Sequence, residues 1–163
     1  MQPIDLTAVP RFAERAHQGQ RYGEEPYTLH LEAVVATLER FGWDDPALLA
    51  AGWLHDCVED CGVALDDIEA LAGPRVAALV DAVTDGPGED RSERKAKPYR
   101  QIPRTPGAIA VKLADRIANV QASLETRPEL VQMYAKEQPV FRERLHRPGE
   151  ADEMWRALEE LLC

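Results

Sequence analysis

The chain lacks the features that mark several large classes of protein. Its 163 residues contain no apolar run of the roughly 18 residues that a membrane-spanning helix needs. The first residues, Met1 to Asp5, do not follow the basic-then-apolar order of a secretion signal. The chain has three cysteines, an odd number, and no secretion signal, so a disulfide framework is not expected. These absences predict a cytoplasmic protein with no membrane partner.

Positive charge is also scarce. The formal net charge of −10 argues against general nucleic-acid binding, which needs a basic surface to displace counterions. The exception is the stretch from Arg91 to Arg104, which is strongly basic and suits a small anionic substrate. Within it we expect Lys97, Arg100 and Arg104 to bind phosphates. The alternative is that this stretch is a solvated face that offsets nearby acids.

The alternation of apolar and polar residues that is typical of strands is almost absent. Apolar residues at helical spacing and helix-terminating residues recur along the chain instead. The apolar content of 45% is sufficient for one core. The sequence predicts an all-α, compact bundle of roughly eight to nine helices that forms a single domain over 1–163. We expect helices at 7–19, 28–41, 45–60, 66–71, 74–83, 105 to beyond 120, 128–145 and 150–162. The basic stretch that ends at Arg100 is expected to be weakly helical.

An apolar segment that ends at Leu54 runs directly into the polar block 55–60. In a continuous helix His55 and Glu59 would share one face, and Asp56 and Asp60 another. Desolvated charges without partners are costly, so we expect this block to bind a ligand. The alternative is a solvated helix end in an acidic protein.

Two further segments carry side chains of the same kind. Asp115 and Asn119 are four residues apart on the predicted long helix, and His30 lies near the start of an earlier one. Alone, His30 would more often be a hydrogen-bonded structural histidine. With His55, Asp56 and Asp115 it completes a set of two imidazoles and two carboxylates, which suits Mn²⁺, Fe²⁺ or Zn²⁺. Four protein ligands plus water favour manganese or iron over tetrahedral zinc.

These residues resemble the ligand pattern of HD-type metal-dependent phosphohydrolases. The string from His55 to Asp60 is similar to that of the RelA/SpoT-type hydrolase domains and the stand-alone small alarmone hydrolases. The resemblance covers about 10–125 and leaves the helices over 128–162 outside it. Its supporting matches are Pro26-Tyr27, Val83-Thr84-Asp85, Glu93-Arg94-Lys95 and the stretch from Lys112 to Asn119.

The resemblance implies one manganese ion and removal of the 3′-pyrophosphate from guanosine tetra- or pentaphosphate, which gives GDP or GTP and pyrophosphate. It implies that Glu59 and Asp60 act in catalysis, that Arg21 stacks on the guanine and that Asn119 lies near the ribose and phosphate. The aromatic Tyr134 could close one side of the pocket.

The chain also departs from the family's pattern. Leu31 stands where a proline usually follows the first histidine, and Tyr22 stands where a lysine often follows the stacking arginine. We expect Tyr22 to contact the substrate as well. These changes concern base recognition and leave the four predicted ligands intact. Two other functions therefore stay open, namely hydrolysis of another nucleotide, such as NADPH or a nucleoside phosphate, and a non-catalytic nucleotide sensor. The oligomeric state is not predicted.

Overall fold

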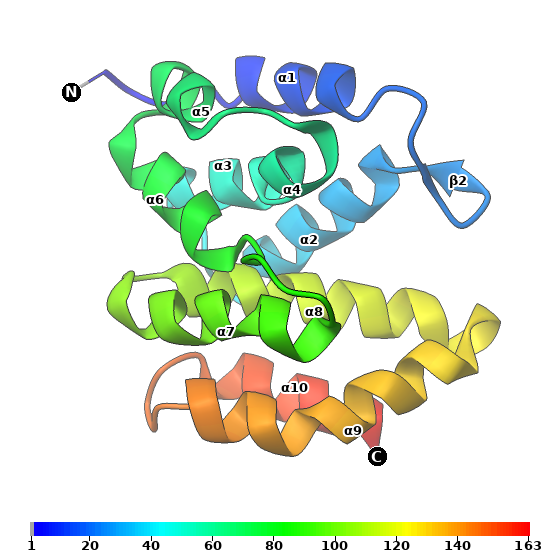
Figure 1. The fold of residues 1–163 in the computed structure, drawn as a ribbon. Helices are drawn as coiled ribbons and strands as arrows, with labels where there is room; N and C mark the ends of the chain where they lie inside the picture. The colour runs from blue at the N-terminus through cyan, green and yellow to red at the C-terminus, as the bar shows by residue number, and fades with distance from the viewer. Residues whose placement is uncertain (1) are drawn as a thin grey trace.

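The computed structural model describes residues 2–163, which are almost wholly helical, as predicted (Figure 1). The helices are α1 Ala8–Ala16, α2 Thr28–Arg40, α3 Pro46–Leu54, α4 Cys57–Cys61, α5 Leu65–Ala72, α6 Pro74–Val83, α7 Arg91–Gln101, the 3₁₀ helix η1 Ile102–Arg104, α8 Ala108–Thr126, α9 Pro128–Leu145 and α10 Asp152–Leu162. A short antiparallel hairpin joins β1 Arg21–Tyr22 to β2 Glu25–Pro26. None of the helices described is long and apolar enough to cross a membrane.

Helix α8 is the centre of the bundle. It crosses the middle of the ribbon, with α9 and α10 below it and α2 and α3 above (Figure 1), and it packs against all four of these helices and against α6. Most of its side chains are buried, and the hydrophobic core draws residues from Val9 in α1 to Leu158 in α10. Polar side chains on α8 therefore lie deep in the molecule, where each of them needs a partner.

The prediction of one helix over 45–60 is wrong. α3 ends at Leu54, and α4 begins at Cys57 after Asp56, whose φ of −102° and ψ of −1° interrupt the helix. In an unbroken helix, neighbouring residues point about 100° apart. The break removes this constraint, so His55 and Asp56 can both face one site.

Gly52 lets α3 lie close against α2. A Cβ atom at this position would lie 3.1 Å from a Val35 methyl carbon and 3.2 Å from one of Leu38. These separations are shorter than ordinary van der Waals contacts, so a larger residue here would push the two helices apart. Because His55 follows less than one turn later, this close packing also fixes the place of the histidine.

The basic stretch is better ordered than predicted. It forms α7, whose first turn is capped by the Asp90 carboxylate, which accepts a hydrogen bond of 2.8 Å from the Glu93 amide. Such a cap satisfies a backbone donor that the helix leaves unpaired. The helix therefore has fixed faces, and its cations point in fixed directions.

Candidate active site

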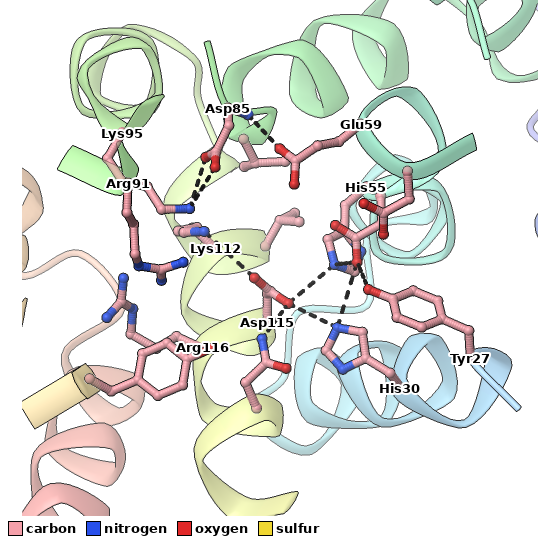
Figure 2. A pocket seen from close by; sticks show the side chains of 16 residues that line it. Tyr27, His30, His55, Glu59, Asp85, Arg91, Lys95, Lys112, Asp115 and Arg116 are labelled. Atoms are coloured by element: carbon pink, nitrogen blue, oxygen red, sulfur yellow. Dashed lines mark hydrogen bonds and ion pairs between the residues drawn. The ribbon is translucent and has the colours of Figure 1, made fainter. Parts of the chain in front are cut away.

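The four residues predicted to bind metal come together in the structure. His30 on α2, His55 and Asp56 at the break, and Asp115 on α8 each offer a ligand atom, and these atoms all lie within 4.8 Å of one another. The Nε2 atoms of His30 and His55 lie 3.0 and 3.2 Å from Asp115 Oδ1. Both rings are buried, and both carboxylates are largely so. Three distant segments of the chain therefore converge on one small space (Figure 2).

Hydrogen bonds around this cluster orient its members. His55 Nδ1 donates to the Gly52 carbonyl oxygen at 2.7 Å, which leaves Nε2 to face the carboxylates. The Tyr27 hydroxyl donates to Asp56 Oδ2 at 2.6 Å, and the Asn119 amide donates to Asp115 Oδ1 at 3.0 Å. Such outer partners fix the orientation of metal ligands, and the carbonyl that accepts from Nδ1 also raises the basicity of the His55 ring.

Tyr22 adds a further connection. Its hydroxyl donates to Asn119 Oδ1 at 2.7 Å, and its ring stacks on His30 at a centroid distance of 4.8 Å and an interplanar angle of 8°. Burial raises the pKa of Tyr22 to about 12, so the phenol keeps its proton and remains a donor. This residue therefore supports two of the four potential ligands.

The electrostatics of the cluster fit a divalent cation. Burial disfavours the charged imidazolium, but the Asp56 and Asp115 carboxylates outweigh it and hold the pKa of His55 well above its usual value. Burial would likewise raise the pKa of Asp115, yet His55 and His30 hold it well below its usual value. Two buried anions thus attract positive charge to this space. Neutral imidazole nitrogens and carboxylate oxygens are ligands that divalent transition metals accept.

A cavity of about 190 Å³ opens beside the cluster. Figure 2 shows Arg91, Lys95 and Arg116 on the opposite side of Asp115 from the two histidines. With Lys112 these form a cationic wall, and all four also line the cavity. Each of the four contacts an acid, as in the bonds of Lys95 Nζ to both Asp85 carboxylate oxygens at 2.8 and 3.0 Å. The cavity therefore places cations opposite two imidazoles, which suits a phosphate chain next to a metal.

Glu59 and Asp60 also line this cavity but are held by different elements. The Asp85 backbone amide donates to Glu59 Oε1 at 2.8 Å, and the Gln20 amide donates to Asp60 Oδ2 at 3.1 Å. Burial raises the pKa of Glu59 above its usual range. A carboxyl group with a raised pKa at a cavity wall is suited to taking up and releasing a proton.

The predicted phosphate clamp does not lie at this cavity. Lys97 donates instead to the Asp81 carboxylate at 2.7 Å and to its carbonyl oxygen at 2.9 Å. Arg100 and Arg104 are exposed and are not among the lining residues. On α7 the residues one turn apart, Arg91 and Lys95, turn toward the site, and Lys97 therefore faces away from it.

A second, larger cavity of about 760 Å³ adjoins the first and shares Asn119 and Tyr134 with it. Arg21 and Tyr22 from the hairpin line it, together with residues of α8 and α9. The structure thus brings four of the predicted substrate-binding residues to the second cavity, and two of them, Asn119 and Tyr134, line both cavities.

Sequence reasoning missed the four cations of the lining as site residues: Arg91, Lys95, Lys112 and Arg116. The sequence held a signal for two of them. Lys112 lies three residues before Asp115 on the same helix and therefore shares a face with a predicted ligand. Lys95 stands in the string Glu93-Arg94-Lys95, one of the matches that support the family resemblance.

Comparisons with known proteins agree with this geometry. A family model described as HD domain matches residues 10–142. The chain belongs to the HD-domain family. Human guanosine-3′,5′-bis(diphosphate) 3′-pyrophosphohydrolase MESH1 is 38% identical over 129 residues, which cover 76% of this chain and 72% of that protein. A solved structure of a metazoan ortholog of SpoT that hydrolyses ppGpp has a TM-score of 0.80 and 26% identity, and covers 99% of this chain and 96% of its own.

Longer relatives contain the HD domain as one part. A probable guanosine-3′,5′-bis(diphosphate) 3′-pyrophosphohydrolase of Synechocystis is 35% identical over 159 residues, which cover 92% of this chain but 20% of that protein. The chain therefore spans only a small share of such relatives, but most of MESH1.

Proposed function

We propose that this protein is a metal-dependent hydrolase that removes the 3′-pyrophosphate from guanosine tetra- or pentaphosphate. The observation that carries this proposal is the metal-competent cluster His30, His55, Asp56 and Asp115, set at one end of a cavity whose other wall is cationic. The similarity to MESH1, whose name states this activity, supports the choice of substrate. One core joins α1 to α10, so we further propose that the chain acts as a single domain.

In this reaction, water adds to a phosphorus atom of the 3′-diphosphate, and the bond from that atom to ribose O3′ breaks. Pyrophosphate leaves, and a proton must reach O3′. A divalent cation held by the four residues would polarise the phosphoryl oxygens and make water more acidic. We propose Mn²⁺ as the cation, with Fe²⁺ or Zn²⁺ as alternatives of similar ligand preference.

The residues at the cavity wall suit the remaining tasks. Glu59, with its raised pKa, and Asp60 can orient the water and accept its proton. Arg91, Lys95, Lys112 and Arg116 are placed to neutralise the phosphates. The second cavity would hold the nucleoside, with Arg21 against the base, and with Tyr22, Asn119 and Tyr134 between base and phosphates.

Turnover of guanosine tetraphosphate by the manganese-loaded protein, with identification of the products, tests the proposal. We expect GDP and pyrophosphate in equal amounts. Asp60→Ala should keep its metal but lose turnover, because Asp60 lies outside the ligand cluster.

Because Tyr22 replaces the lysine common in the family, the same assay should include NADPH and ordinary nucleoside phosphates. Faster turnover of one of these would reassign the substrate and leave the metal centre unchanged. Tight binding of guanosine tetraphosphate without product would instead indicate a sensor.

A further inference from the structure

A buried group of side chains next to the site has no part in the chemistry described so far. His17, at the end of α1, is only 3% exposed. Its ring stacks on Tyr27 at a centroid distance of 4.7 Å, and both of its nitrogens face polar atoms. Nδ1 lies 2.7 Å from Gln20 Oε1, and Nε2 lies 3.7 Å from the Cys57 sulfur. These contacts form a continuous path from the core to Asp60.

The direction of every hydrogen bond on this path can be fixed from its outer end. An ionised carboxylate only accepts hydrogen bonds, so Gln20 must present its NH₂ group to Asp60 Oδ2, 3.1 Å away. The Gln20 carbonyl oxygen then faces His17 and needs a donor, which Nδ1 can supply only if it carries the ring proton. The opposite orientation of the amide would set an oxygen against the carboxylate.

The other end of the path is consistent with this direction. A neutral His17 with its proton on Nδ1 has an unprotonated Nε2, which accepts. The group that faces it is the thiol of Cys57, which is fully buried. The S–H group of this thiol is a weak donor that can point at the nitrogen. Cys61, whose sulfur lies 3.3 Å from Nδ1, offers the same N–H a second, weaker acceptor.

We propose that the hydrogen-bond path from Cys57 through His17 and Gln20 sets the orientation of the Asp60 carboxylate, and that Gln20 is thereby a positioning residue for the reaction. Asp60 is exposed on the short helix α4, and Gln20 is the side chain that bonds it. Without this bond the carboxylate would rotate among solvated rotamers, since only packing or hydrogen bonds select one of them. This role rests on the proposed function, because it assumes that Asp60 contacts the attacking water.

The kinetic test compares Gln20→Ala with Gln18→Ala, which makes the same change at an exposed glutamine on the same segment. Loss of one hydrogen bond to a charged group should lower kcat about tenfold in Gln20→Ala. KM and bound manganese should stay near the wild-type values, and Gln18→Ala should match the wild type throughout. A kcat of Gln20→Ala within twofold of the wild type overturns the proposal.

A double-mutant cycle separates positioning from general damage. In the Asp60→Ala background, the slow residual rate measured with excess protein in a single turnover should show no further loss from Gln20→Ala, because the group that it orients is gone. An equal fold loss in both backgrounds refutes the path. Wild-type protein that releases no pyrophosphate would defeat the proposed function instead.

The hydrogen-bond directions have a test that needs no activity. A long-range ¹⁵N–¹H spectrum of the wild type at neutral pH should show that His17 carries its proton on Nδ1 and that Nε2 is unprotonated. The reverse tautomer would contradict the path even if the enzyme is active.

Discussion

Replacing Tyr27 by phenylalanine removes one hydrogen bond from the metal centre and leaves the ring in place. The hydroxyl donates to Asp56 Oδ2 at 2.6 Å, while the ring keeps its stacking on His17. A hydrogen bond to a charged group contributes about 1.5–3 kcal/mol. Since about 1.4 kcal/mol corresponds to a factor of ten, Tyr27→Phe should weaken manganese binding about 10- to 100-fold.

Equilibrium dialysis of the protein against manganese, after a chelator has removed any bound metal, measures the dissociation constant directly. The matched control is Tyr99→Phe, because Tyr99 is also half-buried, packs near Phe141 and does not line the cavity. We expect this control to bind manganese as the wild type does. A Kd for Tyr27→Phe within twofold of the wild type would show that the phenol does not support Asp56, and the reasoning on outer partners would fail.

Three further outcomes are expected. Asp115→Asn should lose both bound manganese and turnover, as metal analysis beside a pyrophosphate assay would show; an active, metal-free variant would refute the site. Lys95→Met should raise KM for guanosine tetraphosphate about tenfold or more, because a buried cation facing the phosphates is lost; an unchanged KM would contradict the cationic wall. The raised pKa of His55 stabilises the metal-free fold below about pH 6.5, and this contribution is lost as the pH rises through the folded-state pKa. A metal ion binds only the neutral ring, so the difference in Tm between protein with manganese and protein with chelator should grow from about pH 6 to about pH 8. A difference that does not change with pH would refute the role of His55 as a ligand.

Sequence reasoning reached the helical class because apolar spacing and helix ends are local signals. It could not foresee the break between α3 and α4, since neither proline nor glycine marks it. In the structure, His55 at this break bonds to Asp115, 60 residues further along the chain. Contacts of that kind do not appear in local periodicity.

In the candidate site, too, some features could be predicted from local sequence and others depended on contacts distant in the chain. Spacing linked Asp115 to Asn119, and ligand chemistry grouped His30 and Asp115 with the His55-Asp56 pair, a grouping that the family resemblance supported. The resemblance did not say which face of α7 would turn inward. We expected Lys97 at the phosphates, whereas Lys95 lines the cavity, because two residues along a helix turn a side chain by more than half a circle.

The close packing at Gly52 limits how this protein can be engineered. Replacing a helical glycine by alanine is a common way to raise heat resistance, worth about 1 kcal/mol. Here the added methyl would press on Val35 and Leu38, at the residue whose carbonyl accepts the hydrogen bond from His55. A screen for thermal tolerance alone would either reject substitutions of Gly52 or accept one that disturbs the neighbouring metal-binding cluster. Exposed positions far from α3 are the safer targets.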